Sequence, residues 1–167
     1  MSAQFQPAPF ASNLIVNGDF ENLSQGIGYG TRAFGWTSTG AVSGVFGHAG
    51  YTHRVEDHGY ALGGWTSATG QSIAQTVETE VGTAYALVFD AGVHFGGLGA
   101  GVLEVEIEGA SGTRTLASLG VEALSGGSTF SLDLVALDAQ STIRFVYNGH
   151  GAYSTTDIDL DNIGLLP

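Results

Sequence analysis

Apolar and polar residues alternate along most of the chain with a period of two, which is typical of β-strands. The clearest case is "VLEVEIEG", in which Leu103, Val105 and Ile107 fall on one side and three glutamates on the other. Such a strand buries one face and leaves the other in water. No stretch has the i, i+3, i+4, i+7 spacing of an amphipathic helix. Strands are predicted at 13–20, 34–46, 59–66, 71–78, 83–92, 102–109, 128–138, 141–149 and 157–166.

Turn signals separate these apolar runs. "VGT" at 81, "GASGT" at 109, "LSGGS" at 124 and "LDAQS" at 137 are rich in glycine and small polar residues. Short strands joined by such turns, without helices, predict an all-β fold: an antiparallel β-sandwich of the jelly-roll type. We expect a single domain over residues 12–167 and a flexible N-terminal arm over residues 1–11, which hold two of the three prolines.

The charge balance narrows the choice of partners. The chain has 16 acidic residues against 4 basic ones, all arginines, and a net charge of −12. A polyanion would be repelled, so we expect no nucleic-acid partner. No apolar run approaches the roughly 20 residues of a membrane-spanning helix, so no membrane insertion is expected. Neutral glycans and divalent cations remain compatible. No signal peptide is visible in "MSAQFQPAPFAS": either it has been removed, or export uses a C-terminal signal or lysis, or the protein stays inside. An extracellular, surface or particle-associated location is expected.

Both ends of the chain carry carboxylates beside apolar residues. "NLIVNGDFE" ends with Asp19 and Glu21, and "DIDLDNIGL" alternates aspartates with apolar residues. Carboxylates gathered at the edge of a core repel one another and lose hydration, and a bound hard cation such as calcium removes both penalties. The alternative is that they are exposed acids on the strand faces of an acidic protein.

Strict alternation in the last strand makes a further prediction. It places Asp157, Asp159 and Asp161 on the same face as Ile163 and Leu165. The two apolar residues look buried, so the aspartates would lie at the edge of the core.

Four motifs follow one another in a familiar order: "NLIVNGDFE", "GW" at 35–36, "SIAQTVETEVGTAYALVFDAG" and "DIDLDNIGL". In this order the chain resembles, over residues 13–166, the galactose-binding-like β-sandwich carbohydrate-binding modules found beside bacterial xylanases and glucanases and in related bacterial surface proteins. The resemblance implies a non-catalytic module that binds a polysaccharide or cell-surface glycan. It also implies a structural calcium ion, held by the side chains of Glu21 and Asp161 and by the carbonyl of Asp19.

Sugar recognition needs flat apolar surfaces and planar polar side chains. Such residues concentrate before residue 66, mostly in polar loops, with one more in a later glycine-rich stretch. The candidate carbohydrate-binding residues are Trp36, Tyr51, His53, Arg54, Trp65 and His94. Trp36 keeps a second interpretation, because the tryptophan of the "GW" motif more often packs in the core.

Two other function classes compete with glycan binding. The same fold serves as a building block of adhesins and virion spikes, where the aromatic loops would contact protein in a homo-oligomer or larger surface assembly. An enzyme is disfavoured because the chain has no G-x-S-x-G motif, and "GGLGAG" lacks both the third glycine and the following helix of a dinucleotide-binding loop. The sequence also singles out no pair of acids for a glycosidase.

Overall fold

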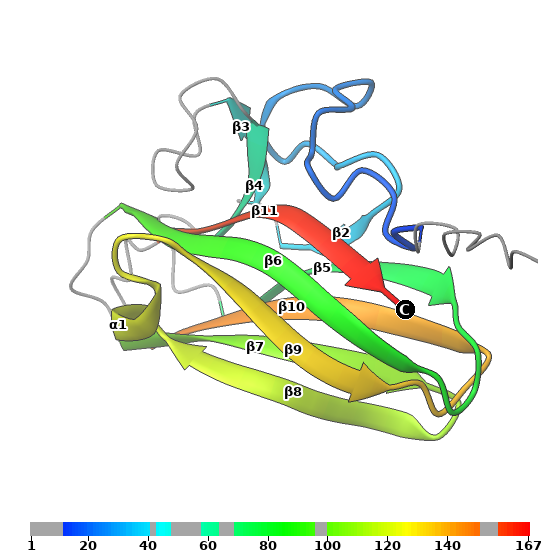
Figure 1. Cartoon of the computed structure of the whole chain (residues 1–167). Helices are drawn as coiled ribbons and strands as arrows, with labels where there is room; N and C mark the ends of the chain where they lie inside the picture. Colours follow the sequence, from blue (N-terminus) through cyan, green and yellow to red (C-terminus); the bar gives the residue numbers. More distant parts are fainter. Residues whose placement is uncertain (1–11, 41–42, 48–57, 64–68, 96–99, 151–156) are drawn as a thin grey trace, which may run out of the picture.

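A computed structural model describes residues 12–40, 43–47, 58–63, 69–95, 100–150 and 157–167. These residues form two antiparallel β-sheets packed face to face, which confirms the predicted all-β sandwich (Figure 1). The segment 1–11, predicted as a flexible arm, lies outside the described residues. None of the helices in the described part of the chain has the length and apolar character needed to cross a bilayer.

The first sheet has six strands, in the order β1-β3-β4-β11-β6-β9. They are β1 (Gly28–Tyr29), β3 (Gly44–Gly47), β4 (His58–Gly63), β11 (Asp157–Leu166), β6 (Ala84–Phe95) and β9 (Ser128–Val135). The second sheet has five strands, in the order β2-β5-β10-β7-β8. They are β2 (Thr37–Thr39), β5 (Thr69–Glu78), β10 (Gln140–His150), β7 (Ala100–Gly109) and β8 (Gly112–Gly120), and the short helix α1 (Val121–Leu124) follows β8.

The core lies between the two sheets and is built by the alternation seen in the sequence. Leu103, Val105 and Ile107 of β7 are buried, as the pattern predicts. The rings of Phe89 on β6 and Phe145 on β10 meet edge-on across the sandwich, 5.0 Å apart between centroids. Each strand therefore gives one face to this core and one to the outside.

The structure differs from the predicted elements in three places. The predicted strand 34–46 is divided, because Gly40 with a φ of 104° ends β2 before β3 begins in the other sheet. The segment 13–20 is not a regular strand. The strand β8 was not predicted, because it lies at a sheet edge where exposed polar residues replace apolar alternation.

The strand β11 changes face halfway along its length. Ile158 and Leu160 face the core in its first half, and Ile163 and Leu165 face it in the second. Strict alternation cannot turn even-numbered and odd-numbered residues to the same side, so β11 must contain an extra residue.

That extra residue is at Asn162, which has a left-handed φ of 50°. The register with β6 shifts between Asp161 and Gly164, as in a β-bulge. The prediction that Asp157, Asp159 and Asp161 share a face with the buried residues after the bulge is therefore wrong. The three aspartates lie on the outer face of the six-stranded sheet, yet they are only 5%, 2% and 1% exposed.

Candidate functional site

The two ends of the described chain lie side by side. The backbone N–H of Leu14 donates to the Leu165 carbonyl at 3.0 Å, and the N–H of Ile163 donates to the Gly18 carbonyl at 2.9 Å. A Cβ atom at Gly18 would overlap the Ile163 carbonyl oxygen, so only glycine permits this approach. We call residues 13–21, 58 and 161–165 the terminal junction.

The opening segment also reaches the five-stranded sheet. The amide side chain of Gln75 on β5 accepts a hydrogen bond from the Val16 N–H at 2.7 Å and donates one to the Val16 carbonyl at 2.9 Å. The segment therefore connects one sheet to the other, because the neighbouring Leu14 and Gly18 bind β11.

A tight turn follows and positions the first carboxylates. Asn17 and Phe20 adopt left-handed φ values of 53° and 54°. The Phe20 ring is fully buried and packs against Trp36 and Tyr60, each 5.7 Å away between centroids. This anchor fixes the backbone next to Glu21.

Glu21 is held by His58 at the start of β4. The His58 backbone N–H donates to Glu21 Oε1 at 2.7 Å, and His58 Nδ1 lies 2.9 Å from Oε2. Desolvation raises the pKa of Glu21, but the backbone and ring hydrogen bonds from His58 and its charge outweigh this, so the pKa lies below its ordinary value. Glu21 is therefore a stable anion.

The structure joins the two backbone segments that carry the predicted metal-binding side chains. The Ile163 N–H donates to the Gly18 carbonyl, so the segments of Glu21 and Asp161 meet at the terminal junction. Asp161 is buried, and its Oδ1 accepts the Asn162 backbone N–H at 2.7 Å. The Asp19 side chain is exposed, and within the described residues it accepts one long contact, 3.4 Å, from the Glu21 N–H.

Among the described residues, no three His, Cys, Asp or Glu side chains gather closely enough to hold a metal ion. The predicted set asks for two carboxylates and one backbone carbonyl, all oxygen donors of the kind that calcium prefers. Those donor types are present at the terminal junction, so the chemistry fits the predicted ion.

A second polar region covers the outer face of the five-stranded sheet. The cross-strand register places residues in rows, one of which runs Thr37, Ala74, Arg144, Glu106 and Thr115. Two adjoining rows have the same character. Each carries a glutamate on β7 and hydroxyl residues on the strands nearer the two edges of the sheet. Their members are Thr39, Ser72, Val146, Glu104 and Ser118, and Thr76, Thr142, Glu108 and Thr113.

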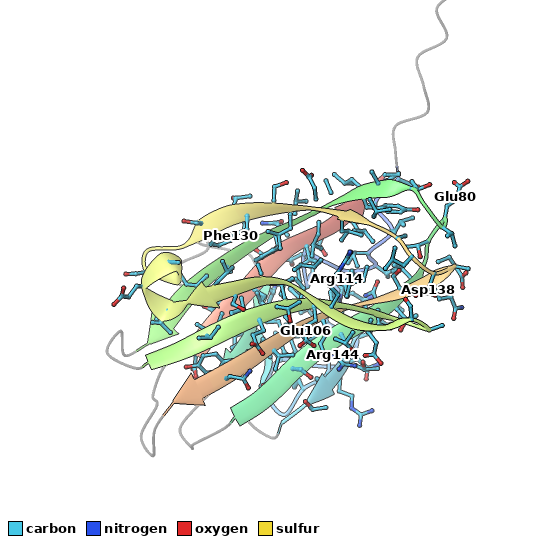
Figure 2. The ribbon with its side chains drawn as sticks, turned by 90° about the horizontal axis from the view of Figure 1, so that it is seen from below. Glu80, Glu106, Arg114, Phe130, Asp138 and Arg144 are labelled. Atoms are coloured by element: carbon cyan, nitrogen blue, oxygen red, sulfur yellow. The ribbon has the colours of Figure 1, made fainter. Side chains whose placement is uncertain are left out.

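This face has two hollows. We call the two hollows together the sheet groove. One hollow of about 460 Å³ is lined by residues of β2, β5, β7 and β10, among them Glu106, Arg144 and Val146. The other, of about 550 Å³, lies toward the β9–β10 turn and includes Glu108, Asp138 and Thr142. Figure 2 looks onto this face and shows Glu106 and Arg144 close together, with Asp138 nearer one end.

Contacts between β7 and β10 order the charged residues of the sheet groove. Arg144 donates to Glu108 Oε2 at 2.6 Å, and Asn148 Nδ2 donates to Glu104 Oε2 at 2.8 Å. The side chains of Arg144 and Glu108 are 35% and 41% exposed, so they remain accessible to a ligand. The groove thus offers donors and acceptors that are already oriented.

The predicted carbohydrate-binding residues have different outcomes. Trp36 is 6% exposed, and its indole N–H donates to the Asn17 carbonyl at 3.0 Å. Its ring faces are covered by the core, so the prediction that it stacks on a sugar is wrong. Tyr51, His53, Arg54 and Trp65 lie outside the described residues, as does the side chain of His94 on β6.

The sheet groove was missed by sequence reasoning, although a signal for it was present. The glutamates of "VLEVEIEG" were assigned to the wet face of a strand, and Arg144 alternates with apolar neighbours in "STIRFVYNG". Only the register of β10 between β5 and β7 shows that these residues share one hollow.

Neither a protein-family model nor a curated protein sequence matches this chain. Solved structures do. TmCBM61 in complex with β-1,4-galactotriose aligns with a TM-score of 0.61 and 14% identity, over 93% of this chain and 99% of that one. The CBM22-1 xylan-binding domain from Paenibacillus barcinonensis Xyn10C aligns with a TM-score of 0.59 and 15% identity, over 95% and 96% of the two chains.

A third similar structure comes from a virus. The enzymatically active domain of bacteriophage CBA120 tailspike protein 4 aligns with a TM-score of 0.58 and 17% identity, over 92% of this chain and only 21% of that one. The predicted likeness to galactose-binding-like modules is confirmed at the level of the fold: this chain has the β-sandwich that carbohydrate-binding modules use.

Proposed function

We propose that this protein is a non-catalytic carbohydrate-binding module that holds a polysaccharide or cell-surface glycan outside the cell. The observation that carries the proposal is the sheet groove, a hollow lined by hydroxyls, carboxylates and one arginine on a fold shared with carbohydrate-binding modules. Sugar hydroxyls both donate and accept hydrogen bonds, and this lining offers partners of both kinds.

Arg144 is the central residue of this proposal. Its guanidinium group has five N–H donors in a fixed plane. Among the described residues, one of these donors binds Glu108. The remaining donors suit the oxygens of a sugar. Glu106 lies opposite Arg144 on β7, and Thr142 lies two positions before it on β10. The ion pair holds the guanidinium in place before a ligand arrives, which lowers the cost of binding.

The groove supports binding better than catalysis. Two of the three glutamates on β7 are held by donors from β10, Glu108 by Arg144 and Glu104 by Asn148. A glycosidase needs a free acid and a second carboxylate on opposite sides of the sugar. The glutamates of β7 instead follow one another along one strand.

Aromatic stacking would come from the loop end of the sandwich. The strand ends that flank segments 64–68, 96–99 and 151–156 meet there, as the pairing of Asp157 with both Gly63 and Phe95 shows. We propose that Trp65 and His94, which belong to the segments and strand ends that meet there, extend the site with ring contacts. Tyr51, His53 and Arg54 belong to segment 48–57, which follows Gly47 and precedes His58 at the opposite end of β4, and we propose them as separate glycan contacts.

Affinity gel electrophoresis against a panel of neutral and charged polysaccharides tests the proposal. We expect retardation on at least one polymer, and a loss of about tenfold or more in affinity for Arg144→Ala, since hydrogen bonds to a charged group contribute about 1.5–3 kcal/mol. Arg114→Ala is the matched control, because Arg114 is exposed on β8 and bonds only the Val135 carbonyl among the described residues. Absence of retardation on every polymer, or equal retardation of both variants, would contradict the proposal.

We further propose that the terminal junction binds a structural calcium ion through Glu21, Asp161 and the Asp19 carbonyl. The ion would neutralise two carboxylates from opposite ends of the chain. It would also compete with His58, which uses both oxygens of Glu21 in this structure. A chelator should then lower the melting temperature of the native protein and leave that of Glu21→Ala unchanged. Identical melting curves with and without the chelator would contradict this proposal.

The likeness to a tailspike domain supports a second candidate function, a subunit of a surface or virion assembly. An apolar patch at the end of the sandwich opposite the loop end supports it too. Val81, Val135 and Leu137 are 62%, 43% and 57% exposed, and the Gly82 N–H binds the Ala136 carbonyl between them. Light scattering after gel filtration distinguishes the candidates: a stable oligomer that Leu137→Asp dissociates favours assembly, and a monomer favours the isolated module.

A further inference from the structure

The sheet groove is strongly acidic for a sugar-binding surface. Four glutamates share this face, and Arg144 is its one basic residue among the described positions. The glutamates are Glu78, Glu104, Glu106 and Glu108. The whole chain adds to this field with its net charge of −12. A glycan that carries uronate or sulfate groups would be repelled on approach.

One glutamate stands out by its contacts. Glu106 lies directly opposite Arg144 in the register, but the arginine reaches along the strand to Glu108 instead. Glu104 is engaged by Asn148. Within the described residues Glu106 makes no hydrogen bond or ion pair, although it is partly buried and lines the 460 Å³ hollow.

An ionised carboxylate in a hollow is an acceptor only, and partial burial has removed some of its water. The group that compensates it best is a cation that also donates hydrogen bonds, because a charge-assisted bond is roughly twice as strong as a neutral one. The hydroxyls of Thr37, Thr39 and Ser72 line the same hollow from β2 and β5. They bond within the sheet, Thr37 to the Ala74 carbonyl and Thr39 to the Gly70 carbonyl and Ser72, and their oxygens can still accept hydrogen bonds from the hydroxyls of a sugar. The hollow therefore combines one anionic position with a hydroxyl-lined rim.

We propose that the sheet groove selects a glycan with free amino groups, such as a glucosamine polymer, and that Glu106 accepts the ammonium group of one sugar. This inference rests on the proposed glycan-binding function. A basic peptide would match the charge of Glu106, but the serine and threonine hydroxyls of β2 and β5 that line the same hollow suit the hydroxyl groups of a sugar better than a lysine side chain.

Isothermal titration tests the inference with three probes of similar length: a glucosamine hexamer at a pH where it is protonated, the N-acetylglucosamine hexamer and hexalysine. We expect the glucosamine hexamer to bind at least tenfold more tightly than the other two. In Glu106→Gln this preference should fall by about tenfold. Glu122→Gln is the control, because Glu122 is exposed on α1 and its substitution changes the net charge equally.

Each outcome decides a different point. Equal losses in Glu106→Gln and Glu122→Gln would reduce the binding to overall charge and overturn the inference, as would hexalysine binding that matches the glucosamine hexamer. If neutral oligosaccharides bind as well as the amino hexamer and Arg144→Ala weakens both, the proposed function stands and the amino-sugar inference falls. If no saccharide binds at all, both fall.

Discussion

The terminal junction and the sheet groove are both rich in polar contacts, but they are built in opposite ways. The junction depends on irregular backbone: three non-glycine residues with left-handed φ, namely Asn17, Phe20 and Asn162, and a close approach at Gly18. The groove lies on regular strands, and its character comes only from side chains at alternate positions.

This difference separates stability from recognition. At the junction the backbone itself is fitted, so few substitutions leave the geometry intact. On the groove face the strands are fixed by the core on their other side, and outward side chains can change with little effect on folding. Substitutions at the junction should therefore change the unfolding free energy, and substitutions in the groove should change ligand binding.

The largest effect is expected at Gly18. A Cβ there overlaps the Ile163 carbonyl oxygen, and neither backbone can move without breaking the bond from the Ile163 N–H to the Gly18 carbonyl. Gly18→Ala should lower the unfolding free energy by roughly 2–4 kcal/mol, measured by urea denaturation. Gly120→Ala is the control, because a Cβ at Gly120 meets nothing within 4 Å. A loss that is equal in the two variants would remove the distinction between junction and regular sheet.

Trp36 tests which region its side chain serves. Trp36→Phe keeps an aromatic ring in the core but leaves the part-buried Asn17 carbonyl without the indole N–H, with a long contact of 3.4 Å from the Phe20 N–H. We expect a loss of about 1–3 kcal/mol in the unfolding free energy and unchanged retardation on any polysaccharide that binds the native protein. A stable variant that no longer binds would return Trp36 to the sugar site.

The Glu21–His58 pair gives a smaller, pH-dependent effect. The folded pKa of Glu21 lies below its ordinary value of 4.5, so its contribution to stability is present above that pH and is lost as the pH falls through the folded pKa. Because Glu21 is exposed, the pair contributes about 0.5 kcal/mol. Melting curves recorded in chelator from pH 7 to pH 3 should fall less steeply below pH 4.5 for Glu21→Gln. Parallel curves for the two proteins would contradict the pair's role.

The smallest effect on stability is expected in the groove. The hydroxyls of Thr76 and Thr142 meet across β5 and β10 at 2.7 Å, in an exposed position. Thr142→Val should change the unfolding free energy by less than about 0.5 kcal/mol, while it weakens glycan binding in affinity gels. A large loss of stability would show that the outer face also holds the sheet together.

The sequence predicted those strands whose own residues alternate between apolar and polar. The alternation in β7 identified Leu103, Val105 and Ile107 as buried, and the strand predicted at 141–149 forms β10. Alternation failed where a strand lies at an edge, as β8 does, or where one backbone dihedral changes the face. In β11 a single left-handed residue, Asn162, reversed the parity of everything after it.

The candidate sites divide in the same way. The carboxylates Glu21 and Asp161 could be named as candidates because each stands in a recognisable motif at one end of the chain. The sheet groove was not found, because Glu106 and Arg144 become neighbours only through the pairing of β7 with β10. Register between distant strands depends on turn geometry and on the buried faces together, and neither is visible in a short motif.

Asn13 shows how closely the two ends of the sandwich are joined. Its side chain accepts a hydrogen bond from the Leu165 backbone N–H at 2.9 Å. The first and last segments of the sandwich are therefore separated by only one amide side chain. A host protein could carry this sandwich as an insertion in a surface loop without stretching either connection. A pulling force applied at both ends would load these few hydrogen bonds one after another, so the junction would unzip while both sheets were still intact.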